Sequence, residues 1–468
     1  MSDLLSIMSA ASTSLAAQRA VTATAGHNID NANTPGYARQ RAELATVLPA
    51  EQVNGGFIGG GARLETVSQS RDRFLEAQIP AAIGSAAQSA EESSALASVS
   101  ALNPSAPGGL SLSLSGFFTQ LRALSQNAGD PGLRQAAVAS AKSLALSFNQ
   151  TRGALESARS GLDQTVSGYL PEVNTLAQTV ADLNRQIRAA RASGGQPNDL
   201  LDARQKAVDR LSELTGATQV PSSEGVNVVL GGGVGLVTGD SAATLAVAPD
   251  LANAGHVAVS LTWKGAAPTT LSDSALGGTI GGALSARDGA LATAVSRIDT
   301  LAYDFATAAN TVHQNGFGLD GSGGRDLFTV SATSDGAARS ITVSAEVLAD
   351  PGALAAASAS TGVPGDAQNL LAIIGTESQA LSAGTDVGAT LSSITAQFGA
   401  ATQRASASSE QDAAVKKNLT DLRQSVSGVS TDEELISMQA AQRAYEAIAK
   451  VIQTSNEMMQ TLLSIKTT

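Results

Sequence analysis

Cysteine is absent from the 468 residues of this chain. Without thiols there is no disulfide, no thiolate nucleophile and no cysteine-ligated zinc. Histidine is scarce, and none of His27, His256 and His313 stands in a Gly-x-Ser-x-Gly or His-Glu-x-x-His pattern. The segment Asp320–Asp326 weakly resembles a Ca²⁺ loop but lacks the glutamate expected at its twelfth position. We therefore expect no catalytic residue, no metal ligand and no cofactor, and we predict that the protein is not an enzyme.

Clustered basic residues and long apolar runs are missing as well. The formal net charge is −12, and phosphate binding needs grouped lysines and arginines, so we expect no nucleic-acid partner. No apolar run reaches the roughly 18 residues that suggest a membrane helix, so we expect no membrane partner. The N-terminus also lacks the basic and apolar regions of a cleaved secretory signal.

Aromatic residues make up only 3% of the chain, although hydrophobic residues reach 43%. The apolar interior must therefore be built mainly from alanine, leucine, valine and isoleucine, which lets helices approach one another closely. This composition predicts thin helical bundles rather than a wide globule.

Small and apolar residues recur in steps of three and four near the N-terminus, which is the spacing of one face of a helix. Turn-forming residues from Asn31 to Tyr37 end this helix. The row, which we call the N-terminal seam, consists of Leu4, Met8, Ala11, Leu15, Thr22, Ala25 and Ile29.

A second row with the same spacing lies near the C-terminus, after a capping box from Thr431 to Glu434. We predict that the two terminal helices pair as a coiled coil. Because small residues dilute the pairing, we expect assembly with other subunits, rather than the monomer, to order these helices. The C-terminal seam consists of Met438, Ala441, Tyr445, Ile448, Ile452, Ser455, Met459 and Leu462.

The two seams have two interpretations. Spacing alone favours an ordinary helical hairpin within one chain. The Asn-rich turn favours contact between subunits, because it redirects the chain and then presents Tyr37, Arg39 and Gln40 as an aromatic and polar surface. We therefore predict an assembly interface formed by Leu4, Met8, Ala11, Leu15, Ile29, Asn31, Asn33, Pro35, Gly36, Tyr37, Met438, Ala441, Tyr445, Ile448, Ile452, Met459 and Leu462.

The pattern between the terminal helices changes at residue 217 and again at 275. Helical periodicity dominates on both sides, and Asp130–Pro131 has the form of a helix cap followed by a first-turn proline. Short β-branched runs separated by Gly, Asp and Asn fill the part between, as is typical of an antiparallel sheet.

The predicted fold is mainly α and elongated, with a small outer antiparallel β domain inserted into a helical bundle. We expect a terminal coiled-coil domain from 1–45 plus 426–468, a helical bundle domain from 46–216 plus 275–425, and a β-rich outer domain at 217–274.

The segment from Thr24 to Gln40 reads TAGHNIDNANTPGYARQ. It resembles the N-terminal signature of the flagellar axial proteins, and in detail that of the FlgK family of hook-associated proteins. The resemblance continues through Gly59–Gly61, Arg71–Leu75, Leu284–Asp288 with the following helix to Phe328, and Ser427–Leu463. It implies a structural component of the bacterial flagellum that joins hook to filament and self-assembles by helix packing, with the terminal coiled coils lining an inner tube.

The same resemblance implies the partners and the location. The expected partners are further copies of the chain in a junction ring, the hook protein, the next hook-associated junction protein, and an export chaperone on the C-terminal helix. Export through the flagellar type III apparatus would place the protein outside the cell, at the hook-filament junction.

Two other functions remain as alternatives. A rod or hook protein of the same superfamily would share Asn33–Gly36 but should lack the long helical stretch from Asp130 to Gly216. A secreted helical binding or effector protein would not assemble into tubes.

Overall fold

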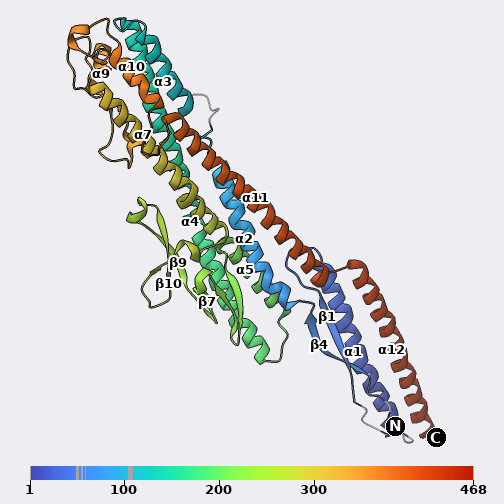
Figure 1. Ribbon diagram of the computed structural model, residues 1–468. Helices are drawn as coiled ribbons and strands as arrows, with labels where there is room; N and C mark the ends of the chain where they lie inside the picture. Colours follow the sequence, from blue (N-terminus) through green and yellow to red (C-terminus); the bar gives the residue numbers. More distant parts are fainter. Residues whose placement is uncertain (1, 49–51, 54–55, 58, 104–108, 467–468) are drawn as a thin grey trace.

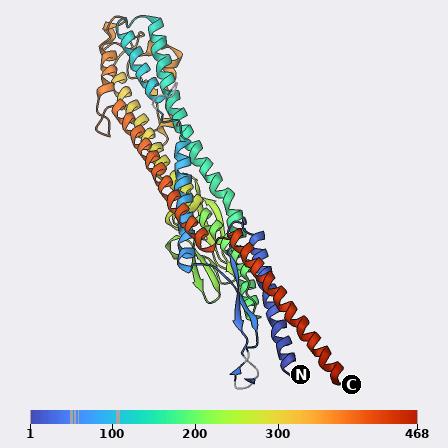
Figure 2. The ribbon, with the colours of Figure 1, turned by 90° about the vertical axis from the view of Figure 1, so that its right-hand side faces the viewer.

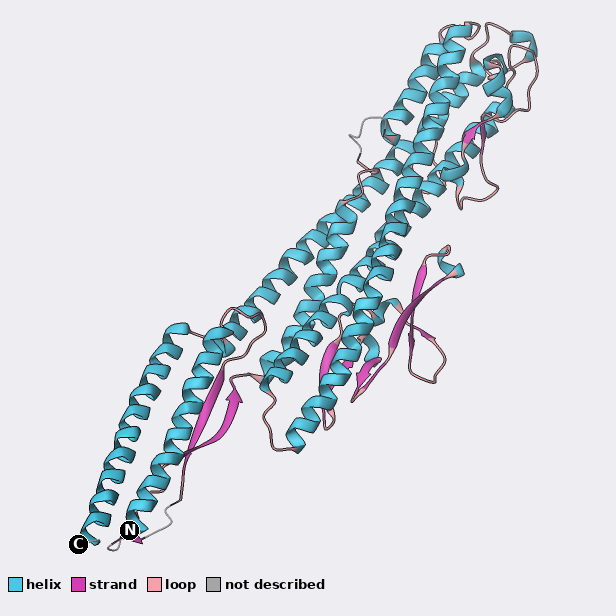
Figure 3. Ribbon diagram, turned by 180° about the vertical axis from the view of Figure 1, so that it is seen from behind, coloured by secondary structure: helices cyan, strands magenta, loops and turns pink. Residues whose placement is uncertain are grey.

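The computed structural model describes residues 2–48, 52–53, 56–57, 59–103 and 109–466. The molecule is elongated, and both chain ends lie at one tip (Figure 1). A pair of terminal helices forms that tip, a helical rod continues from it, and a β lobe lies against one side of the rod (Figures 1 and 3). This arrangement confirms the predicted fold class. Parts of the predicted terminal and bundle domains, at 1, 49–51, 54–55, 58, 104–108 and 467–468, lie outside the described residues.

The terminal helices pair as predicted. Helix α1 (Ser2–Asp30) and helix α12 (Thr431–Lys466) pack against each other and run in opposite directions, so the N- and C-termini lie together (Figure 2). Helix α1 ends in the predicted turn, in which the Thr34 amide donates to the Asn31 carbonyl at 2.9 Å. Gly36 has φ +82° there, a left-handed conformation that favours glycine.

A two-stranded hairpin also packs on α1. Strands β1 (Gln40–Thr46) and β4 (Ala62–Gln69) are antiparallel, with a register shift after Glu43. Gly61 allows the close approach, because a Cβ at this position would lie 2.6 Å from the Ala10 carbonyl oxygen. The hairpin therefore belongs with the terminal pair in space. Beyond it, β2 (Gln52–Val53) pairs with β3 (Gly56–Phe57).

The rod is organised along α4, a continuous helix of 62 residues. Its start matches the prediction: Pro131 is the first helical residue, and the Asp130 carboxylate accepts hydrogen bonds from the amides of Gly132 and Leu133. The elements of the rod are α2 (Arg73–Ala97), α3 (Leu110–Ser125), α4 (Pro131–Ala192), α5 (Asn198–Thr215), α6 (Gly278–Ala286), the π-helical turn η4 (Arg287–Leu291), α7 (Ala292–Gln314) and α11 (Val387–Ser427).

The far tip of the rod gathers five of the nine phenylalanines into one cluster, with ring centroids 5.1 to 6.4 Å apart. The scarce aromatic residues are thus concentrated where several short elements must be held together. The rings belong to Phe117, Phe118, Phe148, Phe305 and Phe328. The short elements are β12 (Phe328–Thr329), α8 (Ala337–Ser340), β13 (Thr342–Val343), α9 (Ala345–Ala349) and α10 (Gln368–Gly375).

The loop that resembles a Ca²⁺ site is held by an internal ion pair. Arg325 donates from both terminal nitrogens to the carboxylate of Asp320. Within the described ranges, no group of three or more metal-binding side chains comes together. In the same ranges, no helix combines the length and the apolar character needed to cross a membrane.

The β lobe consists of two antiparallel sheets, with strand orders β5-β6-β7-β8 and β11-β10-β9. Its apolar core is continuous with that of the rod, so the lobe packs on α4 rather than standing apart. The strands are β5 (Thr218–Ser222), β6 (Gly225–Val229), β7 (Gly235–Thr238), β8 (Ser241–Ala242), β9 (Thr244–Pro249), β10 (Val257–Thr262) and β11 (Thr269–Thr270). They fall within the predicted β-rich range.

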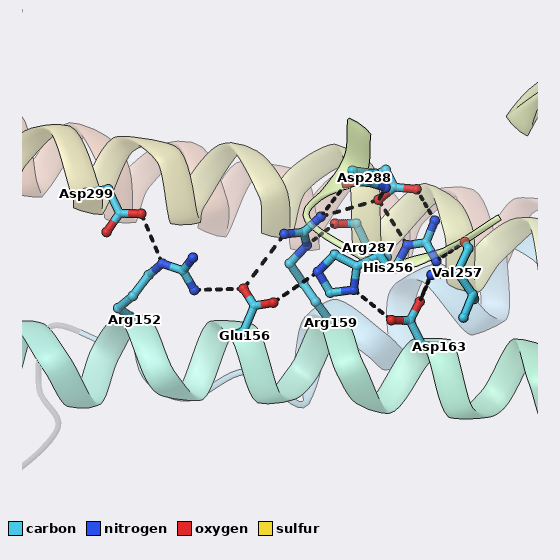
Figure 4. A network of polar contacts seen from close by, with 10 residues as sticks. Arg152, Glu156, Arg159, Asp163, His256, Val257, Arg287, Asp288 and Asp299 are labelled. Atoms are coloured by element: carbon cyan, nitrogen blue, oxygen red, sulfur yellow. Dashed lines mark hydrogen bonds and ion pairs between the residues drawn. The ribbon is translucent and has the colours of Figure 1, made fainter. Parts of the chain in front are cut away.

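A row of half-buried and buried charged side chains on α4 contacts the lobe and the π-helical turn (Figure 4). His256, which precedes β10, lies between two carboxylates of α4: its Nδ1 is 2.7 Å from Asp163 Oδ2, and its Nε2 is 3.0 Å from Glu156 Oε1. Arg287 of the π-helical turn binds Asp163 and donates to the Val257 carbonyl at 2.8 Å. Arg287 and His256 are both buried.

A second carboxylate completes the environment of Arg287. Its guanidinium donates to both oxygens of Asp288, at 2.9 and 2.6 Å. Burial by itself would raise the pKa of Asp288, but hydrogen bonds from Arg287 and Asn253 and the charge of Arg159 hold that pKa below its usual value. Because the folded-state pKa is lowered, this group contributes stability above its ordinary pKa and loses it as the pH falls.

We predict that Arg287→Met destabilises the protein by about 1–3 kcal/mol, because it leaves two half-buried carboxylates, Asp163 and Asp288, without their main partner. Urea unfolding at neutral pH should show a lower midpoint, and acid unfolding should depend less on pH than in the wild type. Arg185→Ala is the matched control on α4, since its ion pair with Asp182 is exposed and worth about 0–1 kcal/mol. Equal midpoints for the two variants would contradict the role of Arg287.

Candidate assembly interface

Most residues of the two predicted seams are covered within the single chain. Helix α12 packs against α1, and Ala441 and Ser455 of the C-terminal seam are buried there. In the N-terminal seam, Ala11 and Ala25 are buried. The half-buried members are Leu4, Met8, Leu15, Thr22, Ile29, Met438, Tyr445, Ile448, Ile452 and Met459, whereas Leu462 is exposed.

The contact between α1 and α12 also includes a polar pair. The Arg19 guanidinium donates to the Tyr445 hydroxyl at 3.0 Å, and its central carbon lies 5.5 Å from the centroid of the tyrosine ring. This stacked geometry stabilises the helix pair through a cation–π contact. Tyr445 therefore serves the pairing of the two helices inside one chain.

The residues of the Asn-rich turn divide into two groups. Asn33, Pro35 and Gly36 are exposed. Asn31 is half-buried, and its side chain donates to the His27 carbonyl at 3.0 Å. Tyr37 is also half-buried, and its hydroxyl donates to Asn28 Oδ1 at 2.7 Å. The exposed edge of the turn is thus short, and the tyrosine points into the chain.

Asn28 is the centre of this part of the molecule and has no exposed surface. Its amide nitrogen donates to the Gln40 carbonyl at 2.8 Å and to Glu434 Oε2 at 3.0 Å. Its side-chain oxygen accepts from the Tyr37 hydroxyl and, at 2.9 Å, from the backbone amide of Gln40. All the hydrogen-bonding capacity of one side chain is used, and it links α1, β1 and α12.

Arg39 and Gln40 do not form the outward surface predicted from the sequence. Arg39 Nε donates to Glu434 Oε1 at 2.7 Å, and its NH1 donates to Glu433 Oε2 at 2.8 Å. Gln40 is buried and donates to Asp199 Oδ1 at 3.1 Å. The physical reason is that two acidic helix starts lie beside this segment: the first turn of α12 binds Arg39, and Asp199 in the first turn of α5 binds Gln40.

The predicted capping box is also corrected. Helix α12 starts at Thr431, so Ser430 precedes it and its hydroxyl oxygen accepts from the Glu433 amide at 3.5 Å. The Glu434 side chain, expected to reach back along its own helix, is instead bound by Asn28 and Arg39. We call Asn28, Tyr37, Arg39, Gln40 and Glu434 the joint network, because they lie where the terminal pair meets the rod.

Negative charge around Tyr37 fits its role as a donor. Burial raises the pKa of its hydroxyl, and the nearby carboxylates of Asp202, Asp199 and Glu434 raise it further. The hydroxyl therefore keeps its proton for the bond to Asn28. Asp202 extends the contacts toward the rod, because it also accepts from Gln69 at 2.9 Å and binds Arg71.

A second apolar row on α12 is left uncovered. Its members recur at spacings of four and seven residues, which places them on one face of a helix, and that face is turned away from α1. Large exposed apolar side chains in such a row mark a surface that binds another molecule. We call this the outer row; it consists of Ile436, Ala440, Ala447, Val451, Met458 and Ile465. Leu5 and Ile7 of α1 are exposed as well.

Comparison with known proteins bears on what this surface does. The Flagellar hook-associated protein FlgK helical domain matches residues 98–328, and the Flagellar basal body rod FlgEFG protein C-terminal domain matches residues 423–465. Flagellar hook-associated protein 1 of Salmonella typhimurium is 29% identical over 352 residues, covering 73% of this chain and 64% of that protein. The matched part of this chain thus spans slightly less than two thirds of the Salmonella relative.

One further relative and one solved structure are covered over more of their own length. Flagellar hook-associated protein 1 of Bacillus subtilis is 27% identical over an alignment of 487 positions, covering 96% of both chains. The structure of the flagellar hook junction protein FlgK from Burkholderia pseudomallei aligns with a TM-score of 0.67 and 18% identity, over 75% of this chain and all of that one. The latter similarity supports the fold.

We predict that Asn28→Ala loosens the joint, because it leaves the buried Gln40 amide and Glu434 carboxylate short of partners, at about 1–3 kcal/mol for each unsatisfied group. Amide hydrogen exchange at residues 28–45 and 431–440 should be faster than in the wild-type protein. Asn33→Ala, at an exposed position of the same turn, should leave exchange unchanged. Identical exchange in the wild type and Asn28→Ala would show that the network does not order the joint.

Proposed function

The chain belongs to the FlgK family of flagellar hook-associated proteins, and from this membership we propose that it is a structural component of the junction between flagellar hook and filament. The observation that carries the proposal is the outer row of α12, a row of exposed apolar side chains along the helix with no cover among the described residues. In a homopolymer the same face recurs on every subunit, so a modest apolar contact is multiplied around the structure.

The arrangement of the chain suits a tubular assembly. The terminal pair, 1–45 plus 426–468, would line an inner tube, with the helical bundle of 46–216 plus 275–425 packed around it and the β-rich part at 217–274 outermost. The packing of β1 and β4 on α1 favours including this hairpin with the inner part. The role requires no bond to be made or broken, so we propose no catalytic activity.

The proposed partners follow from the position at the junction. They are other copies of the chain, the hook protein on one side and the next hook-associated protein on the other. The outer row would be exposed before assembly, which suits cover by an export chaperone until the chain leaves the cell. The proposed location is outside the cell, on the flagellum.

The alternatives are weaker on specific grounds. A rod or hook protein of the same superfamily should lack a helix as long as α4, and this helix lies in the segment that matches the FlgK helical domain. A secreted binding or effector protein is disfavoured because the family models and curated relatives that the chain resembles are flagellar.

We predict that deleting the gene in its own bacterium leaves hooks without filaments and abolishes swimming. Electron microscopy of isolated hook structures provides the readout, and restoring the gene in trans is the control. Filaments of normal length on the deletion strain would exclude the junction role.

Substitutions at three consecutive residues of α12 distinguish an effect on assembly from an effect on folding. Val451 lies in the outer row, Ile452 faces α1, and Lys450 is exposed and charged. Val451→Asp should leave the monomer folded but prevent filament growth, because a carboxylate buried between subunits costs several kcal/mol. Ile452→Asp should disturb the helix pair itself as well as assembly, whereas Lys450→Ala should behave like the wild type.

The readouts are secretion, circular dichroism of the purified chain, and filament counts on cells. Secretion must be measured first, because a variant that is not exported cannot report on assembly. If Val451→Asp is exported and filaments still grow normally, the outer row is not part of the assembly interface.

A further inference from the structure

A large aromatic side chain is exposed at the base of the rod. Phe74 is in the first turn of α2 and has 83% of its surface exposed. The Asp72 carboxylate accepts from the Phe74 amide at 2.8 Å and from the Leu75 amide at 3.2 Å, which fixes where the helix starts. Leu75 and Ile79 then pack inward. The cap therefore holds the Phe74 ring outside the packed face. In the single chain this exposed ring contributes little apolar burial to stability.

More exposed apolar residues lie at the same level of the molecule. Leu422 and Val426, one turn apart at the end of α11, are exposed. The Ser70 hydroxyl donates to the Val426 carbonyl at 3.0 Å, which holds the start of α2 beside the end of α11. The start of α12 belongs to the same region through Arg39: the Arg39 carbonyl accepts from the Ser70 amide at 2.9 Å, and its guanidinium donates to Glu434 at 2.7 Å. There, Leu435 and Ile436 are exposed.

We infer that Phe74, Leu422, Val426, Leu435 and Ile436 form one docking surface, the joint band, whose occupant is a second copy of this chain. The argument is continuity: Ile436 is both a member of the band and the first residue of the outer row. A neighbour that covers the outer row along α12 reaches Ile436 at the start of that helix. Leu422 and Val426 lie at the end of α11, on the other side of the short connection at residues 428–430. This inference rests on the proposed function and extends the subunit contact across the joint onto the rod.

The extension has a physical consequence for the assembly. A contact confined to the thin terminal pair would fix a neighbour only at the inner end of the molecule. Adding the joint band places contacts on both sides of the joint network, so the angle between terminal pair and rod is set by the neighbour as well as by internal hydrogen bonds. Phe74, with its rigid ring, supplies the largest anchor of the band.

The absence of cysteine makes a direct test possible, because any introduced cysteine is the only thiol in the chain. Phe74→Cys is compared with Val451→Cys in the outer row and with Leu251→Cys, a control at a leucine of the β lobe that is 92% exposed. Each full-length variant is labelled with a maleimide both as the isolated chain and in isolated hook-filament structures.

We expect Phe74→Cys to react roughly tenfold or more slowly in the assembled structure, because a covered thiol reacts only when the contact opens. Val451→Cys should be protected to a similar degree, and Leu251→Cys should react at the same rate in both samples. Protection at 451 with free reaction at 74 would overturn the joint band and leave the proposed function standing. Free reaction at both positions would overturn the proposed function too.

The identity of the occupant needs a second measurement. A photoreactive benzoyl-phenylalanine at position 74, activated in the isolated hook-filament structures, should give an adduct of twice the 46.8 kDa chain mass. An adduct with a different flagellar protein, or protection at 74 without any adduct of two copies, would overturn the assignment to a second copy.

Discussion

The burial of Asn28 is the constraint on which the inner half of the molecule depends. A side-chain amide with no exposed surface needs a partner for every hydrogen bond, because water cannot reach it to replace a missing partner and the unsatisfied group destabilises the fold. Its partners come from the turn after α1, from β1 and from the first turn of α12. The two ends of the chain, the hairpin and the turn can therefore reach their positions only together.

The features predicted from sequence are those that have a local cause. The seams, the start of α4 at Pro131, and the β-branched runs all follow from periodicity or from a cap within a few residues. The partners of Arg39 have no such cause, because Glu434 lies 395 residues further along the chain. Nothing near a polar turn residue says whether it faces water or a distant carboxylate, so the inward direction of Arg39 and Gln40 appeared only in the structure.

The candidate site shows the same limit in another form. Two apolar rows share α12, and the spacing of three and four identified the one with larger residues, such as Tyr445 and Ile452. That row packs on α1 within the chain. The outer row contains Ala440 and Ala447 between its larger members, which makes it weak as a sequence pattern. Periodicity finds the faces of a helix, but it cannot tell which of them the chain itself will cover.

Polar and apolar contacts thus have different tasks in this molecule. Apolar burial is strong but non-directional, so it would let the terminal pair slide or rotate against the rod. Hydrogen bonds to a buried amide or guanidinium depend on distance and angle, so the joint network at the inner end and the contacts of Arg287 beside the β lobe each permit one orientation. In the proposed assembly, any error in subunit geometry would be repeated at every contact, so the orientation would have to be fixed inside the subunit before the apolar surfaces of neighbours meet.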